Sequence, residues 1–212
     1  MVISYAITTH NEHEEINDLL EFLVHNTDPE DEIVILDDFS DEPTQQVFQS
    51  WNQQYGDVKK IIIEQRKLNK NFAEQKNYLT SMCKGSYIFN IDADEKPHTI
   101  LISQIKQILE INDVDLVWVP RVNTVKGLTE EHIKKWGWNV TEKGWVNYPD
   151  YQARIYRNEP DRIKWIKPVH EIISGHDTYS HLPPQEELSL YHHKEIKKQE
   201  EQNKFYEGII RK

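Results

Sequence analysis

Short apolar runs alternate with amphipathic stretches along the first half of the chain. The apolar runs are rich in Val and Ile, as is typical of buried strands. They cover residues 2–7, 32–36, 59–63, 86–91 and 115–119. Between them, apolar residues recur at helical spacing over residues 14–25, 44–54, 72–83 and 99–111. This alternation predicts an α/β fold with a mainly parallel, Rossmann-like sheet and helices on both of its faces.

The pattern changes after Pro120, where the chain becomes rich in aromatic residues, among them Trp136, Trp138, Trp145 and Tyr148. Strand-like runs follow at residues 152–156, 163–166, 169–173 and 188–191. The residues from 195 onward have the composition of a charged helix. No repeat or low-complexity linker separates the two halves. We therefore expect one unit in which residues 1–119 form the sheet and residues 120–212 form a smaller, aromatic-rich region.

Composition narrows the classes of protein that fit. The chain has 212 residues, which suits one domain, and its net charge of −11 gives no broad basic face, so nucleic acid is an unlikely partner. No apolar run approaches the roughly 20 residues of a membrane-spanning helix. The first residues have no basic flank and resemble a strand rather than a signal peptide. The single cysteine, Cys83, fits a reducing compartment, so we expect a cytoplasmic protein.

The charged residues near the C-terminus are expected to form a solvated helix face held by salt bridges. This face would carry Lys194, Lys197, Lys198 and Lys204 among Glu195, Glu200 and Glu201. The alternative is peripheral contact with an anionic membrane surface.

Polar side chains follow three of the predicted strands at the points where the strands end. These clusters cover residues 8–12, 37–41 and 92–95. Ligands of parallel α/β sheets bind at the carboxyl ends of the strands. The three clusters should therefore converge on one crevice.

The third cluster carries the strongest chemical signal, because Asp92 and Asp94 directly follow a buried strand. Mg²⁺ and Mn²⁺ prefer carboxylate oxygens and are commonly held by one or two carboxylates together with substrate phosphates. The pattern predicts a Mn²⁺ or Mg²⁺ site at Asp94 and Asp92, where the metal would neutralise charge on a diphosphate leaving group. Solvated acids in a strand-end turn are the alternative.

The other strand ends add candidate ligand contacts. Asp38 has the chemistry to accept hydrogen bonds from a nucleobase or ribose, although a helix cap is another use of its acidic cluster. Thr8, His10 and Asn11 are candidates for contacting the base or, alternatively, for closing a turn. Lys76, inside the third predicted helix, places a cation where a pyrophosphate would meet it, unless it is simply solvated.

These residues together resemble the nucleotide-binding half of the family 2 glycosyltransferases, which have the A-type glycosyltransferase (GT-A) fold. The resemblance covers residues 2–119. It is carried by Ile7-Thr8-Thr9-His10-Asn11-Glu12, Asp37-Asp38-Phe39-Ser40-Asp41, Asn71-Phe72-Ala73-Glu74-Gln75-Lys76-Asn77 and the run from Gly85 to Glu95. At the third stretch the family usually has Gly-x-Ala-x-Ala-Arg-Asn, and Lys76 keeps the charge without the fork of Arg. The resemblance implies Asp38 at the base, Asp92 at the ribose or sugar, and Asp94 at the metal.

The second half is similar to a branch of this family that includes lipopolysaccharide-core glucosyltransferase-like proteins. The matching stretches are Pro149-Asp150-Tyr151-Gln152-Ala153-Arg154, Val169-His170-Glu171 and His192-His193. Arg154 is a candidate for binding phosphate. His192 or His193 is a candidate for a third metal ligand or a diphosphate contact, since neutral imidazole is a common metal ligand.

The resemblance implies an enzyme that moves a sugar from a nucleotide-sugar, with a UDP-sugar favoured, to a saccharide, lipid-linked saccharide or other hydroxyl acceptor. An inverting transferase needs a general base on the acceptor hydroxyl. Glu171 is the first candidate and Asp150 the second; the alternative for Glu171 is pairing with a nearby cation. One of Trp136, Trp138 and Trp145 is expected to face the acceptor, because sugars stack on aromatic rings, which are also ordinary core material.

Two other functions stay open. A nucleotidyltransferase that makes nucleotide-sugars shares the sheet topology, but it needs a Gly-rich, basic loop after the first strand to hold a triphosphate. Residues 8–14 contain no glycine and two acids, which disfavours this function. A non-catalytic sugar- or protein-binding module on the same fold would not need Asp92, Asp94 and Glu171, all of which are present.

Overall fold

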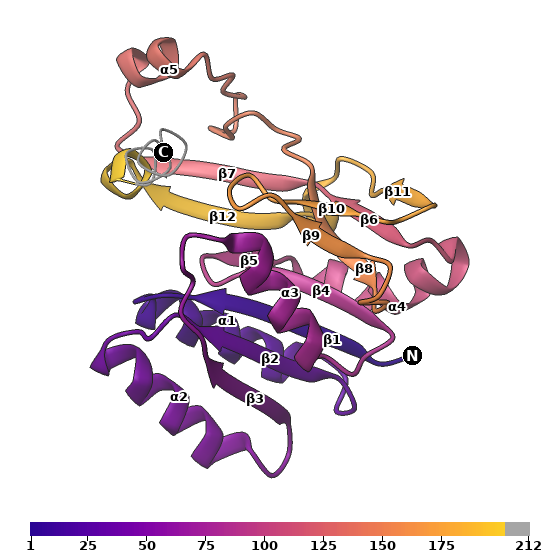
Figure 1. Ribbon diagram of the computed structural model, residues 1–212. Helices are drawn as coiled ribbons and strands as arrows, with labels where there is room; N and C mark the ends of the chain where they lie inside the picture. The colour runs from indigo at the N-terminus through magenta and orange to yellow at the C-terminus, as the bar shows by residue number, and fades with distance from the viewer. Residues whose placement is uncertain (202–212) are drawn as a thin grey trace.

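The Val- and Ile-rich runs form five of the strands of a seven-stranded sheet in the computed structural model, which describes residues 1–201 (Figure 1). The sheet has the order β11-β6-β8-β4-β1-β2-β3. Its strands are β1 (Ile3–Thr9), β2 (Glu32–Asp37), β3 (Lys60–Gln65), β4 (Tyr87–Asp92), β6 (Leu116–Val119), β8 (Gln152–Arg157) and β11 (Tyr179–His181). Of these seven strands β8 alone is antiparallel to its neighbours, which confirms the mainly parallel sheet.

Side-chain alternation along each strand decides which face of the sheet a residue covers. In β1, Ile3, Tyr5 and Ile7 belong to one core cluster and Ala6 to another. The first cluster packs against α1 (His13–Asn26), α2 (Glu42–Tyr55) and α4 (Thr99–Asn112). The second packs against α3 (Phe72–Met82) and the hairpin of β9 (Lys164–Ile166) and β10 (Ile172–Ser174). Helices on both faces of the sheet are therefore confirmed.

A second, three-stranded sheet adjoins the carboxyl end of β4. Its order is β5-β12-β7, with β5 (Glu95–Pro97), β12 (Leu190–Glu195) and β7 (Arg121–Lys126). The sequence did not predict β5 or β7, because β5 is short and β7 has a single buried residue, Val122. A short 3-10 helix, η1 (Glu186–Leu188), precedes β12.

Two predicted elements have different boundaries from those expected. The strand expected at residues 188–191 begins at Leu190 and continues to Glu195, so Lys194 lies in a strand and not in the C-terminal helix. Residues 196–201 are helical, and the rest of that expected helix lies outside the described residues. The strand expected at residues 169–173 begins only at Ile172, because His170 has a positive φ of 53°, which a strand does not tolerate.

The second half of the chain enters the large sheet and also extends beyond it. β8 lies between β4 and β6, whereas the segment between β7 and β8 projects from the body of the molecule (Figure 1). This segment carries α5 (Glu130–Trp136), in which Trp136 stacks on His132 with ring centroids 5.2 Å apart. The sequence predicted the aromatic content of this segment but not its helix.

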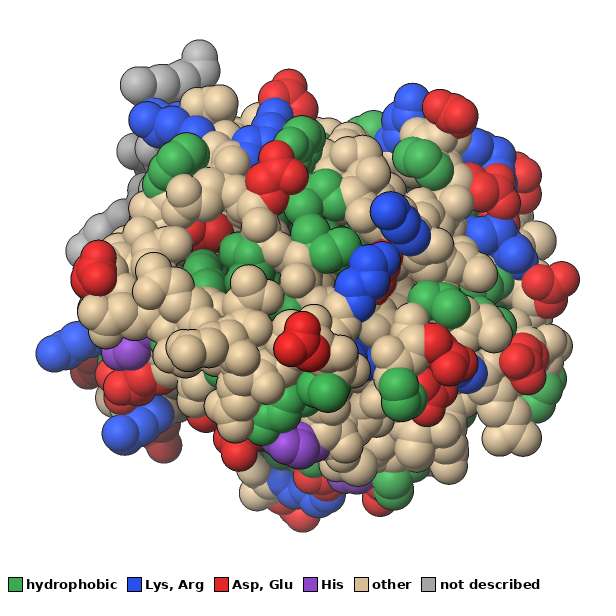
Figure 2. Space-filling view, turned by 90° about the horizontal axis from the view of Figure 1, so that it is seen from below, with side chains coloured by type: hydrophobic (Ala, Val, Ile, Leu, Met, Phe, Trp, Pro, Cys, Tyr) green, Lys and Arg blue, Asp and Glu red, His purple; other side chains and the backbone are tan. Residues whose placement is uncertain are grey.

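The surface carries charges of both signs. On the face that Figure 2 shows, acidic and basic side chains are interspersed with apolar ones. Acidic residues outnumber Lys and Arg by 36 to 25, so neither sign is scarce. Of the helices within residues 1–201, none is both long and apolar enough to span a membrane.

Asp115 joins the start of β6 to the loop between β10 and β11. Its carboxylate accepts hydrogen bonds from two nitrogens of the Arg162 guanidinium, both at 2.8 Å, and from the backbone N–H of Asp177 at 2.8 Å. The hydrogen bonds from Arg162 outweigh burial and hold the pKa of Asp115 below its ordinary value. The ionised carboxylate therefore stabilises the fold.

Asp115→Asn is expected to lower the free energy of unfolding by about 1–3 kcal/mol at pH 7, because these donors lose their charged acceptor. The pKa is lowered in the folded state, so the stabilisation is present above the ordinary pKa of about 4 and is lost as the pH falls below it. Urea denaturation should show a difference from wild type at pH 7 that shrinks below about pH 4. Asp161→Asn, at an exposed position, is the control. Equal stability of the two variants would contradict this account.

Candidate active site

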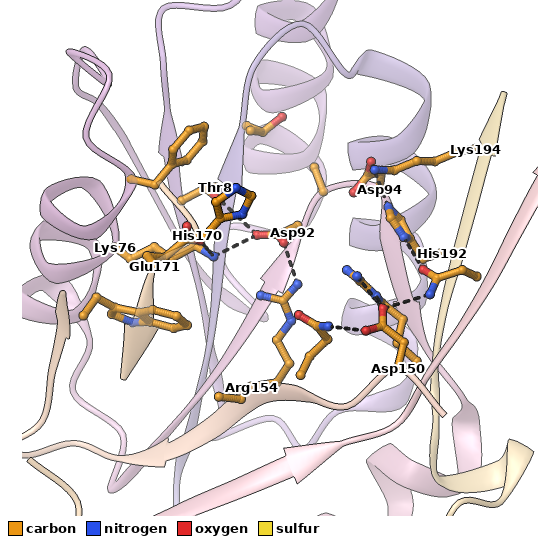
Figure 3. A pocket seen from close by; sticks show the side chains of 18 of the residues that line it. Thr8, Lys76, Asp92, Asp94, Asp150, Arg154, His170, Glu171, His192 and Lys194 are labelled. Atoms are coloured by element: carbon orange, nitrogen blue, oxygen red, sulfur yellow. Dashed lines mark hydrogen bonds and ion pairs between the residues drawn. The ribbon is translucent and has the colours of Figure 1, made fainter. Parts of the chain in front are cut away.

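A cavity of about 940 Å³ lies at the carboxyl ends of β1, β2 and β4, beside the three-stranded sheet (Figure 3). All three strand-end clusters line it, so their expected convergence on one crevice is confirmed; they contribute Thr8, His10, Asp38, Asp92 and Asp94. Other elements contribute Lys76, Asp150, Arg154, Glu171 and His192. The large sheet, the small sheet and the loop before β10 therefore meet around one cavity.

Asp92 lies at the centre of the charged groups in the cavity (Figure 3). Its Oδ2 accepts a hydrogen bond from Arg154 Nη2 at 2.6 Å, and its Oδ1 lies 3.4 Å from Lys76 Nζ. Thr8 Oγ1 donates to the same Oδ1 at 3.4 Å. Burial alone would raise the pKa of Asp92, but the charges of Arg154 and Lys76 outweigh it and hold the pKa well below its ordinary range. Asp92 is therefore a carboxylate with a cation on each side.

Glu95 stabilises this arrangement, and sequence reasoning did not identify it as a site residue. Its side chain is fully buried, and its Oε1 lies 2.5 Å from Arg154 Nη2 and 2.7 Å from Arg121 Nη1. Its Oε2 accepts the backbone N–H of Asp92 at 3.2 Å. Glu95 thus fixes two guanidinium groups and the strand end. In the sequence, the feature that could have indicated this role is the position of Glu95 directly after the Asp-x-Asp pair.

Lys76 is buried rather than solvated. Its side chain is 4% exposed, and its Nζ lies 2.7 Å from Glu171 Oε1 and 4.6 Å from the centre of the Trp165 ring system. The same ammonium contacts Asp92, so Lys76 links a strand end of the first half to Glu171 of the second half. Glu171 therefore does pair with a cation, and it also lines the cavity.

Asp150 lies on the other side of the cavity from Lys76 (Figure 3). Its Oδ2 accepts hydrogen bonds from Arg121 Nη2 at 2.6 Å and Asn123 Nδ2 at 2.8 Å, and its Oδ1 accepts one from Gln152 Nε2 at 2.9 Å. Burial raises the pKa of Asp150, but Arg121 and the amide donors outweigh it, so the pKa is lowered. A carboxylate stabilised in this way is a weak base.

Asp94 and His192 are the residues best placed to hold a metal ion. His192 Nε2 lies 3.4 Å from Asp94 Oδ2, and His192 Nδ1 lies 2.7 Å from Asn123 Oδ1. Burial raises the pKa of Asp94, but the hydrogen bond from His192 and its charge outweigh burial and lower the pKa to about 2. The partner of the second ring nitrogen fixes the orientation of the imidazole, as in known metal sites. The pair offers two of the donors that a divalent cation needs, while within residues 1–201 no group of three His, Cys, Asp or Glu side chains is placed to hold a metal.

His193 does not share this site. Its side chain is exposed, its Nδ1 lies within hydrogen-bond distance of Thr124 Oγ1, and its ring stacks on Tyr191 with centroids 5.8 Å apart. Successive side chains of a strand point to opposite faces. Because both histidines belong to β12, only His192 reaches the cavity.

The residues after β1 divide between the cavity and a turn. His10 lines the cavity, and its Nδ1 lies 2.9 Å from the backbone oxygen of Asp38. Asn11 has a positive φ of 56°, and its Oδ1 accepts the backbone N–H of Asp41 at 2.7 Å. Asn11 therefore closes the turn, as the alternative interpretation held. Asp38 lines the cavity, with its Oδ1 accepting the backbone N–H of Leu68 at 2.9 Å.

Part of the charged C-terminal segment belongs to the cavity wall. Lys194 and Gln199 line the cavity, and Lys198 Nζ lies 3.3 Å from Glu12 Oε1 and 3.7 Å from Asp94 Oδ2. The expected salt bridges are present at Lys198, but the expected solvation is wrong for the residues that line the cavity, because β12 brings the chain back to the carboxyl end of β4. Burial raises the pKa of Glu12, and the neighbouring Asp94 raises it further.

Three indole rings line the cavity, those of Trp118, Trp138 and Trp165. Of the three tryptophans in the aromatic-rich segment, Trp138 is the one in the lining, and Trp136 packs against it with the rings tilted by 46° and their centroids 4.6 Å apart. Aromatic rings of this kind offer flat apolar surfaces beside the charged groups.

The sequence matches the family model of glycosyl transferase family 2 over residues 4–172, which is most of the chain, and the protein belongs to this family. Its fold resembles crystal structures of S. aureus TarS. For TarS 1–349 the TM-score is 0.62 at 16% identity, over 91% of this chain and 60% of that chain. For TarS 1–349 in complex with UDP-GlcNAc the TM-score is 0.63 at 16% identity, over 91% of this chain and 58% of that chain.

The chain thus spans about three-fifths of the length of those TarS structures. At such identity the likeness shows the fold, a mixed α/β architecture of the GT-A type. No curated protein sequence matches the chain. The similarity to the lipopolysaccharide-core branch stays a prediction.

Glu95→Gln is expected to lower the free energy of unfolding by about 1–3 kcal/mol, because it takes one of two carboxylate partners from each of Arg121 and Arg154. Urea denaturation followed by circular dichroism measures the change. Glu187→Gln, at an exposed position, is the control and should stay within about 0.5 kcal/mol of wild type. If the Glu95 variant is as stable as this control, the buried network does not stabilise the fold.

Proposed function

We propose that this protein is a metal-dependent glycosyltransferase that transfers a sugar from a UDP-sugar to a hydroxyl acceptor and inverts the anomeric carbon. The observation that carries the proposal is the strand end at Asp92 and Asp94, where the first carboxylate lies between two cations and the second faces His192. Family membership supports sugar transfer from a nucleotide-sugar. The TarS complexes with UDP-GlcNAc and with UDP support a uridine nucleotide.

The donor is proposed to bind along the carboxyl ends of the parallel strands, largely on residues 1–119. Asp38, with His10 beside it, would lie at the base, and Asp92 at the ribose or sugar. Asp94 and His192 would hold Mn²⁺ or Mg²⁺, which neutralises charge on the diphosphate when bound. Arg154 and Lys76 keep Asp92 ionised and add positive charge near the diphosphate.

Glu171 is the proposed general base, within the half formed by residues 120–212. It lines the cavity and approaches Asp92 through their shared contact with Lys76. Asp150 is the weaker candidate, because three donors stabilise its ionised form. The rings of Trp138 and its neighbours favour a saccharide or lipid-linked saccharide acceptor. A cytoplasmic location belongs to the same proposal.

Two measurements separate this function from others on the same fold. They are a thermal-stability screen of nucleotide-sugars, with Mn²⁺ and with a chelator, and an assay of turnover. A ligand that binds only the folded state raises the melting temperature. A transferase should be stabilised by UDP-sugars when metal is present. A nucleotidyltransferase should instead release pyrophosphate from a nucleoside triphosphate and a sugar phosphate. A binding module should bind a sugar without turnover.

Asp94→Asn is expected to abolish metal-dependent UDP binding and to leave the fold intact, because it removes the carboxylate that faces His192. In calorimetry, wild type should bind UDP at least about tenfold more tightly with Mn²⁺ than with chelator, a difference of roughly 1.4 kcal/mol. The variant should show equal affinity in both conditions. Asp18→Asn, at an exposed position on α1, is the control. An unchanged metal dependence in the Asp94 variant would reject the assignment.

Glu171→Gln is expected to leave UDP-sugar affinity within about twofold of wild type and to lower turnover by about 10²–10⁴, the usual contribution of a general base. Asp150→Asn should act mainly on stability. The two variants are compared by initial rates with a working acceptor and by donor titration.

The pair of variants also separates the two candidate bases. Full activity in Glu171→Gln, together with lost activity in a folded Asp150→Asn, would transfer the role to Asp150. A product that retains the anomeric configuration of the donor, determined by NMR, would reject direct displacement.

A further inference from the structure

Lys198 brings a positive charge into the donor end of the cavity from the last helical turn of the described chain. Its ammonium lies 3.1 Å from Glu15 Oε1, 3.3 Å from Glu12 Oε1 and 3.7 Å from Asp94 Oδ2. These carboxylates come from α1, from the turn before it and from the end of β4. A single side chain therefore fastens residues 196–201 to three separate acids.

The oxygen of Asp94 that faces Lys198 is the same atom that faces His192. His192 Nε2 lies 3.4 Å from Asp94 Oδ2, and Lys198 Nζ lies 3.7 Å from it. A divalent ion bound to this oxygen and to the imidazole would have an ammonium as its neighbour. Two cations that contact the same carboxylate oxygen repel each other. The partly buried surroundings screen this repulsion less than water does.

The acids around Lys198 require a cation. Glu12, Glu15 and Asp94 each place a carboxylate oxygen within 3.7 Å of the Lys198 ammonium, and Glu12 is only 19% exposed. Lys198 supplies part of the balancing charge, and Lys194 adds to it at Asp94. Lys197, its neighbour in the same helix, is exposed and lies outside the cavity lining.

We infer that Lys198 is an internal counter-ion of Asp94 that competes with the divalent cation, so that metal binding separates Lys198 from Asp94 and weakens the attachment of residues 196–201 to the donor site. The inference rests on the proposed function for the role of Asp94 as a metal ligand. The competition follows from the shared oxygen atom. The position of the helix at residues 196–201 is therefore expected to change when a metal ion binds at Asp94.

The test measures Mn²⁺ affinity of the full chain without nucleotide, by electron paramagnetic resonance of free Mn²⁺. Lys198→Met removes the competing charge and should bind Mn²⁺ at least about fivefold more tightly than wild type. Lys198→Gln should behave in the same way, and Lys198→Arg should resemble wild type. Lys197→Met is the matched control and should stay within about twofold of wild type.

Hydrogen exchange gives a second readout that does not depend on turnover. In wild type, Mn²⁺ should raise exchange at the amides of residues 196–201, because the ion removes one of the three carboxylate contacts of Lys198. In Lys198→Met, exchange there should already be high without metal, and Mn²⁺ should change it little. Lys197→Met should follow the wild-type pattern.

Three results would overturn the inference. The first is a Mn²⁺ affinity of Lys198→Met equal to that of Lys197→Met. The second is the lack of Mn²⁺ binding in all of these proteins. The third is metal-independent UDP binding that disappears in Lys198→Met, which would make Lys198 a replacement for the metal. Failure of the proposed function is seen separately, as the lack of stabilisation by any nucleotide-sugar in the donor screen.

Discussion

The structure depends on pairing several carboxylates with cations in and beside one cavity. Asp92 and Glu95 share the guanidinium of Arg154, and Arg121 and Lys76 supply the other cations. An unpaired charge at a buried position costs several kcal/mol, so each of these groups requires its partner. The network therefore constrains which segments of the chain must come together. It also explains how a cavity with so many acids is stable.

This constraint joins the two halves of the chain. The acids at residues 92–95 belong to the first half, whereas Arg121 and Arg154 come from β7 and β8 of the second. β8 lies between β4 and β6, so the strand that supplies Arg154 is part of the large sheet itself. The three-stranded sheet adds His192 at the same place. The site is assembled only when the complete fold has formed.

The same network gives chemically similar side chains different surroundings. Asp92, Asp94 and Asp150 all have lowered pKa values, because nearby hydrogen-bond donors and positive charges outweigh their burial. Glu171 has a different environment, with Lys76 as its ion-pair partner. At Lys76 the chain departs from the arginine usual in the family, and the compact ammonium packs over an indole ring. The environment of each acid thus follows from its neighbours.

The sequence by itself determined the parallel sheet, the helices on its two faces and the strand-end position of Asp92 and Asp94. These features are local, because strand alternation and helical spacing are written in neighbouring residues. The tertiary structure alone decided that His192 and not His193 enters the cavity, that Glu95 anchors the cations, and that Lys198 reaches the donor end. Lys198 and its partner in the turn before α1 are 186 positions apart. Contacts over such separations leave no periodic trace in the sequence, because they arise only when the sheets pack and bring their ends together.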